Sequence, residues 1–349
     1  MESQPDTQPP EGEPAEEEVE TPEDRSALSE WRTPIVLFVL TSLSTLWVGA
    51  QMEGVANPSF DTLWQGWTFA VPLMAILVSH EMGHYVAGRI HRVDTSPPYF
   101  IPMPLSLLGT MGAVIKMRGR IRSRDALLDI GASGPLAGMV VALPVLLYGL
   151  HESPVEPLTL TGAYIMEGHS VLYVAALYLV KGPIPEGYDI MLSPCALAGW
   201  AGLLVTMINM IPFGQLDGGH VAYALFGKRQ DRLSKRMIWL LAILAVFVSL
   251  GYGIPSMMAG DPDYIQTGNF YAGVPWLVWA GMLLLMRRYG GSDHPPTDDD
   301  VLSPKRRVIA AGTLVLFLLL FMPSMVRSFV PSDSAEPSDS AESAETAVG

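Results

Sequence analysis

Long apolar stretches, separated by short polar segments, fill the chain between residues 33 and 330. A helix needs roughly 20 mostly apolar residues to cross about 30 Å of hydrocarbon. Seven stretches are of about that length or longer, and they lie near residues 34–50, 63–90, 127–150, 190–226, 237–258, 273–287 and 308–330. The pattern predicts an all-α polytopic membrane protein with about seven transmembrane helices.

The segment 93–124, between the second and third stretches, has a different pattern. Four prolines between residues 97 and 104 prevent a long helix there. Beyond them, basic residues recur with a period of two, which is typical of a strand; they are Lys116, Arg118, Arg120, Arg122 and Arg124. We expect a small β element at the membrane surface, although a basic patch attracted to anionic lipid headgroups fits the same residues.

The composition agrees with a membrane protein, because 49% of the residues are hydrophobic and only 16% are charged, whereas soluble domains carry about 25% charged residues. The net charge of -14 arises at the ends: residues 1–30 hold eleven acids and one base, and residues 31–288 hold fifteen acids and sixteen bases. A nearly neutral core excludes nucleic-acid binding by a basic surface. The only cysteine, Cys195, excludes a disulfide framework and a cysteine metal cluster.

The two acidic ends contain too few large apolar residues to fold. Residues 1–32 are therefore expected to form a disordered N-terminal arm, and residues 331–349 a disordered tail. The transmembrane domain then occupies residues 33–330, in contact with the lipid bilayer.

The distribution of lysine and arginine predicts the orientation, because these residues accumulate in cytoplasmic loops. With seven spans and the N-terminus inside, nineteen of the twenty-one basic residues are cytoplasmic, and only Lys181 and Arg327 are outside. An eighth span at residues 163–181 would break this pattern, so that segment is expected to be a helix on the outer surface. We expect an integral protein of a prokaryotic cytoplasmic (inner) membrane.

The second apolar stretch contains the sequence His80-Glu81-Met82-Gly83-His84. Positions i and i+4 share one face of a helix, so both imidazoles can reach one metal ion while Glu81 points toward a metal-bound water. This is the arrangement of zinc hydrolases. Ionisable groups at membrane depth are kept mainly where they pair, bind or react; a hydrogen-bonded polar cluster that ties helices together is the alternative.

Zinc needs a third protein ligand and an open position for water. Asp217 is the only carboxylate in the fourth apolar stretch, where several Pro and Gly residues interrupt the helical pattern between Asn209 and His220. His80 and His84 precede Arg89 by nine and five residues, and Asp217 precedes Lys228 by eleven. At 1.5 Å per residue all three lie about 8–16 Å below the cytoplasmic boundary, so they can meet at one level.

These motifs resemble those of the site-2 proteases, which are zinc metalloproteases that cut peptide bonds within the membrane. The resemblance rests on the HExxH sequence at His80–His84, on an N-x-x-P-x-x-x-L-D-G run at Asn209–Gly218 and on a Gly-Pro-Leu-Ala-Gly sequence at Gly134–Gly138. It covers roughly residues 63–288 and is nearest to the cyanobacterial and plastid-like branch of the family.

The resemblance implies a role for each of these residues. His80, His84 and Asp217 would ligate Zn²⁺, Glu81 would be the general base, and Asn209 would stabilise the oxyanion or orient the substrate. The substrates implied are single-span membrane proteins such as membrane-anchored regulators, usually trimmed first by another protease of the site-1 type. Residues 109–113 and the segment after them are similar to the family's membrane-surface sheet, which holds the substrate extended.

Two departures and two alternative functions accompany this interpretation. Only about 40 residues separate Gly149 from Ile190, too few for the PDZ domain of many relatives, and a nucleotide-sensing domain is also missing.

A divalent-metal transporter would use similar ligands, but such proteins show repeated halves and neither metal motif recurs. A non-catalytic zinc-binding scaffold would not need Glu81. His220 is expected to be satisfied by backbone or water rather than to support the metal site.

Overall fold

The structure is a computed structural model that describes residues 27–119, 121–157, 164–258, 269–290, 297–298 and 301–329. The predicted tail at residues 331–349 and most of the predicted N-terminal arm lie outside these residues. The first helix begins at Ala27, so the last residues assigned to the arm, up to residue 32, are helical instead.

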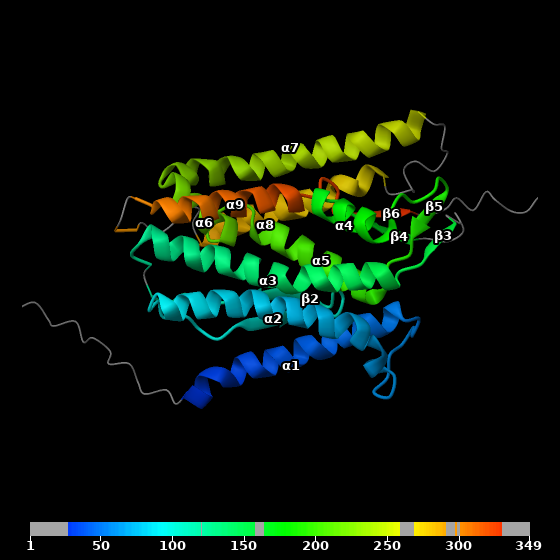
Figure 1. The fold of residues 1–349 in the computed structure, drawn as a ribbon, viewed down its shortest axis with the longest axis horizontal. Coiled ribbons are helices and arrows are strands. Elements are labelled where there is room, and N and C mark those ends of the chain that lie inside the picture. The colour runs from blue at the N-terminus through cyan, green and yellow to red at the C-terminus, as the bar shows by residue number, and fades with distance from the viewer. Residues whose placement is uncertain are drawn as a thin grey trace, which may run out of the picture.

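Helices dominate the described part of the chain and lie side by side along one direction, with α1 at one edge and α7 at the other (Figure 1). They are α1 (Ala27–Met52), α2 (Trp67–Ile90) with the short 3-10 helix η1 (Leu63–Gly66) before it, α3 (Arg124–Glu152), α4 (Val171–Lys181), α5 (Pro194–Asn209), α6 (Asp217–Phe226), α7 (Arg229–Met258), α8 (Val274–Gly290) after the 3-10 helix η2 (Asn269–Gly273), and α9 (Pro304–Leu320).

Within the described residues, four helical segments are long and apolar enough to cross a membrane: Glu30–Met52, Arg124–Glu152, Arg229–Pro255 and Phe270–Tyr289. The helix α2 is long enough, but the polar side chains of its HExxH sequence lower its hydropathy. The apolar stretch at 190–226 is divided into α5 and α6, and α5 has 16 residues. The predicted number of seven spans therefore remains a prediction.

A pair of antiparallel strands, β1 (Tyr99–Pro102) and β2 (Thr110–Val114), lies between α2 and α3. The strand predicted from the alternating basic residues is wrong in position, because β2 ends at Val114, before the first of them. Beyond β2 the chain pairs only irregularly: Thr95 and Met117 form an isolated bridge, and the Ser96 hydroxyl accepts from the Lys116 N–H. Alternation of charge therefore marks an extended segment here, but not a regular strand.

At the end of the bundle opposite α6, short strands join distant parts of the chain (Figure 1). The strand β3 (Val155–Pro157) pairs with β5 (Tyr188–Ile190), and β4 (Tyr164–Glu167) pairs with β6 (Val326–Phe329).

Two expected helices are shorter than their apolar stretches because of these strands. Of the described residues 164–181, only α4 is helical, and its 11 residues are about 16 Å long at 1.5 Å per residue. The helix expected at 308–330 ends at Leu320, shortly before Pro323, since a proline and the residue before it disfavour helical backbone.

The centre of the bundle is α3, which packs against α2 on one side and α5 on the other. Large side chains of the three helices are fully buried there, including Leu73 and Leu77 of α2, Leu146 of α3 and Trp200 of α5. Burying apolar area of this kind stabilises a fold by about 25 cal/mol per Å² in a soluble protein. In this bundle the packing fixes the three helices that carry or surround the predicted metal ligands.

Candidate metal centre

The three predicted metal ligands meet, although they come from helices far apart in the sequence. The Nε2 atom of His80 lies 3.1 Å from Oδ2 of Asp217, and Nε2 of His84 lies 3.2 Å from Oδ1 of the same carboxylate. The two imidazole Nε2 atoms are 3.2 Å apart. These residues form the one cluster of three His, Cys, Asp or Glu side chains in the described chain that could hold a metal ion.

The spacing of the ligand atoms fits a zinc-sized ion. A tetrahedral ion with bonds of about 2.0–2.2 Å has its ligand atoms about 3.3–3.6 Å apart, and the distances between these nitrogen and oxygen atoms are close to that range. Two imidazoles and one carboxylate are also a donor set that leaves one tetrahedral position for water or substrate. The residues present therefore fit a catalytic divalent metal such as zinc.

The α2 helix delivers both histidines and the glutamate to one cavity. Residues four apart lie on the same face of a helix, so His80 and His84 are neighbours, with their ring centroids 5.0 Å apart and their rings edge to face at 70°. Glu81 is buried, with 4% of its surface exposed. It lines a cavity of about 130 Å³ together with His80, His84 and Asp217. A carboxylate, a metal position and room for a water therefore coincide.

The turn between α5 and α6 brings Asp217 to the histidines. The chain leaves α5 at Asn209 and enters α6 at Asp217, with Gly214 in the left-handed region at φ 49°. A Cβ at Gly218 would overlap the carbonyl oxygen of Met210, so the turn can close this tightly only without a side chain there. The buried Ser234 hydroxyl of α7 accepts from the Gly214 N–H at 3.1 Å.

A backbone carbonyl of α3 orients His84. Its Nδ1 lies 2.7 Å from the oxygen of Ile130, and donation of the Nδ1 proton to that oxygen leaves the Nε2 lone pair for a metal. Such a hydrogen bond fixes the tautomer and the ring plane of a metal-binding histidine. No sequence pattern could have predicted the Ile130 carbonyl as this acceptor, because every residue carries a carbonyl group.

The remaining predicted residues also lie at the centre. The Nδ2 atom of Asn209 is 3.4 Å from Nε2 of His80. His220 lines the cavity and is 4% exposed, so it lies nearer to the chemistry than the sequence indicated. Gln215 and Thr95 line the same cavity, and no motif pointed to them.

The glycine sequence on α3 allows the histidines to approach. A Cβ at Gly134 would overlap the imidazole of His84, and a Cβ at Gly138 would lie 3.2 Å from both Cβ and Nδ1 of His80. The motif Gly134–Gly138, which carries part of the family resemblance, therefore permits close approach of α3 to the two histidines.

We expect G134A to displace the His84 ring and to weaken metal binding by about 10–100-fold, the usual effect of disturbing the orientation of a ligand. Titration of the purified protein with zinc measures this. The matched control is G312A on α9, where a new Cβ meets no atom within 4 Å, and its affinity should equal that of the wild type. Equal affinities of G134A and G312A would show that this contact does not shape the site.

A helical bundle in which an HExxH helix and an aspartate from a second helix converge on one cavity with a buried glutamate defines a metallohydrolase type of site. The sequence model described as peptidase family M50 matches residues 68–250, which contain both metal motifs and α3 between them. The chain belongs to this family. The match confirms the resemblance to the site-2 proteases.

Named relatives point to the same family. The rice (Oryza sativa subsp. indica) protein "Probable zinc metalloprotease EGY2, chloroplastic" is 35% identical over 185 residues, covering 52% of this chain and 34% of the relative. In Arabidopsis thaliana, the EGY2 protein is 30% identical over 199 residues, covering 56% and 35%, and the EGY1 protein is 29% identical over 219 residues, covering 56% and 39%. The chain therefore aligns with between a third and two fifths of each relative's length. No solved structure matches it.

These relatives are named as chloroplast proteins. They give no support to the expectation of a prokaryotic cytoplasmic membrane. That expectation rested on the positive charge of the loops, which predicts the sidedness of a membrane protein but not the kind of membrane.

Proposed function

We propose that this chain is a zinc-dependent endopeptidase that cleaves single-span membrane proteins within the lipid bilayer. The observation that carries the proposal is the convergence of His80, His84 and Asp217 on one cavity that also contains the buried Glu81. A metal site for structure or transport has no need of a buried carboxylate beside its ligands, whereas hydrolysis needs a proton acceptor at that position. The names of the relatives agree with zinc and with proteolysis.

Each residue then has a task in hydrolysis. Zinc, when bound, would act as a Lewis acid that lowers the pKa of water and polarises a peptide carbonyl. The Glu81 carboxylate removes a proton from the attacking water and delivers it to the nitrogen of the leaving amine. The Asn209 amide donates a hydrogen bond to the developing oxyanion or to the substrate backbone beside it.

The substrate must be extended near the site, because the carbonyl groups of a helix are occupied by their own hydrogen bonds. The cavity wall includes Ala113 and Val114 at the end of β2 and Ile115 just beyond. In the described residues β2 pairs only with β1, which leaves one strand edge able to pair with an unwound segment of substrate. Membrane-anchored regulators, trimmed first by another protease, are the class of substrate that such a site suits.

The same proposal includes seven spans, with the N-terminus and the site on the side of the membrane that carries the lysine and arginine clusters. It is supported by the helical content and by the charge distribution. The α2, α5–α6 and α9 helices then cross the bilayer together with the four longer apolar helices.

Cysteine labelling in a C195A background tests this topology. A cysteine introduced at Ser292 should be labelled only from the basic side, and cysteines at Ser59 and Ser334 only from the opposite side. A probe at Ser334 that reports the same side as Ser292 would mean that the number of spans is even.

The experiment that separates protease from transporter uses the wild-type protein in vesicles together with a panel of single-span membrane proteins. We expect cleavage that a zinc chelator abolishes and that added zinc restores. Zinc flux across the vesicles with every candidate substrate intact would contradict the proposal and favour a divalent-metal transporter.

A further inference from the structure

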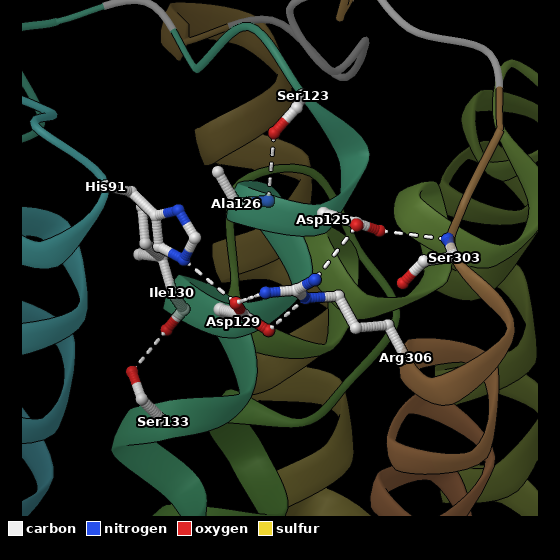
Figure 2. A network of polar contacts seen from close by, with 9 residues as sticks. All are labelled: His91, Ser123, Asp125, Ala126, Asp129, Ile130, Ser133, Ser303 and Arg306. Atoms are coloured by element: carbon white, nitrogen blue, oxygen red, sulfur yellow. Dashed lines mark hydrogen bonds and ion pairs between the residues drawn. The ribbon is translucent and has the colours of Figure 1, made fainter.

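A cluster of charged side chains ties three helices together near the metal centre but outside its cavity (Figure 2). Arg306 of α9 binds Asp129 of α3 through two parallel hydrogen bonds, Nε to Oδ1 at 2.8 Å and Nη2 to Oδ2 at 2.6 Å. Its Nη1 also donates to Asp125 at 2.9 Å. A two-point contact between arginine and carboxylate fixes orientation as well as distance.

Asp129 also holds the end of the metal-binding helix. The Nε2 of His91, the residue that caps the C-terminus of α2, donates to Oδ2 of Asp129 at 2.8 Å. His91 follows the ligand His84 by seven residues, which is two helical turns. The α2 helix is therefore attached to α3 at two adjacent points, through His91 to Asp129 and through His84 to the carbonyl of Ile130.

These two attachments involve consecutive residues of one helical turn of α3. Any rotation or shift of that turn moves the Asp129 carboxylate and the Ile130 carbonyl together, because they are joined by one peptide unit of a helix. The turn itself is anchored from the opposite side by Arg306, and the Asp125 carboxylate accepts from the Ser303 N–H just before α9 at 3.0 Å. Figure 2 shows Arg306 and His91 approaching Asp129 from opposite sides.

Apart from this cluster, nothing connects the helix α9 with the proposed hydrolysis. It lies beyond residues 68–250, which the family accounts for, and no described residue of α9 lines the cavity. A single ion pair on a surface contributes little to stability, yet Arg306 and Asp129 are only 32% and 25% exposed and share a network with Asp125 and His91.

We propose that Asp129 and Arg306 are positioning residues of the metal centre: through them α9 holds α3 at the register that presents the Ile130 carbonyl to His84 and thereby directs Nε2 of His84 to the metal. The proposal rests on the proposed function, since it gives α9 a part in the same site. Neither residue touches the metal or the substrate.

Cobalt substitution tests this independently of proteolysis. The visible absorption bands of bound Co²⁺ report the geometry of its ligands, and a role confined to general stability would leave them unchanged in folded protein. In D129N and R306A we expect shifted bands and an affinity for Co²⁺ and Zn²⁺ lower by about 10–100-fold, as is usual for residues that orient a ligand. R306K, with one point charge in place of a fork, should lie between R306A and the wild type.

Two comparisons complete the experiment. The neighbouring Arg307 donates to the Leu302 carbonyl and not to α3, so R307A should show the wild-type spectrum and affinity. If Arg306 acts through Asp129, the two substitutions remove the same interaction. The affinity of the double variant D129N/R306A for metal should then equal that of whichever single variant has the lower affinity.

Wild-type bands and affinity in D129N and R306A, or effects that simply add in the double variant, would overturn the proposal while leaving the proposed function intact. A wild-type protein that binds no Co²⁺ or Zn²⁺ would instead refute the proposed function, and the positioning role with it.

Discussion

E81Q should retain about the same zinc content as the wild type and lose about 10²–10⁴-fold in the rate of cleavage. Glutamine keeps the size of the side chain and its ability to form hydrogen bonds in the buried site, but it cannot accept the proton of the attacking water, and general-base catalysis contributes a factor of that order. Metal analysis of the purified variant and a cleavage assay on the same preparation measure the two quantities together.

The control for E81Q is E156Q, because Glu156 lies exposed on β3. That variant should match the wild type in both zinc content and rate. Loss of zinc from E81Q in proportion to the lost activity would show that Glu81 is a ligand and that its assignment as the base is wrong.

D217A and D217N should lose zinc and activity together. Removal of the carboxylate leaves only two imidazoles, whereas catalytic zinc sites use three protein ligands. The asparagine variant is the sharper of the two, because it keeps the shape of the side chain between His80 and His84 but not the negative charge that attracts the cation. Zinc content, cleavage rate and thermal unfolding should be measured on each purified variant.

The exposed Asp61, which accepts from the Ser59 hydroxyl in the loop after α1, provides the control, and D61N should keep its zinc and its activity. A D217N protein that retains a full complement of zinc while losing activity would remove Asp217 from the ligand set.

The convergence of the three predicted ligands could be foreseen from the sequence because it follows simple helical geometry. The i, i+4 spacing places His80 and His84 on one face of a helix whatever the rest of the fold does. The depth of Asp217 relative to the nearest basic residue then placed it at the level of the histidines. The first placement follows from the 3.6 residues per turn of a helix and the second from its rise of about 1.5 Å per residue. The side-chain atoms of the three residues that could bind a metal do lie within 4.8 Å of one another.

The supports of the centre could not be predicted in the same way. The carbonyl of Ile130 has no signature, and Arg306 finds Asp129 across 177 residues of sequence, a pairing that depends on where α9 lies. The strands β4 and β6 also pair across a long stretch of sequence, and neither strand has a recognisable pattern of its own. Residues 163–181 and 308–330 were therefore expected to be helices throughout. Local pattern predicts helices and the ligands they carry, but tertiary contacts decide where those helices end and what holds them.

The most direct test of the proposed peptidase is to follow cleavage of a single-span substrate by the wild-type protein in vesicles prepared in ¹⁸O-labelled water. Mass spectrometry of the two fragments locates the cleaved bond and counts the oxygen taken from water. We expect cleavage of a bond within the transmembrane segment, one ¹⁸O in the new carboxyl group, and neither product with E81Q. Intact substrate with the zinc-loaded wild type, or equal cleavage by wild type and E81Q, would contradict the proposed function.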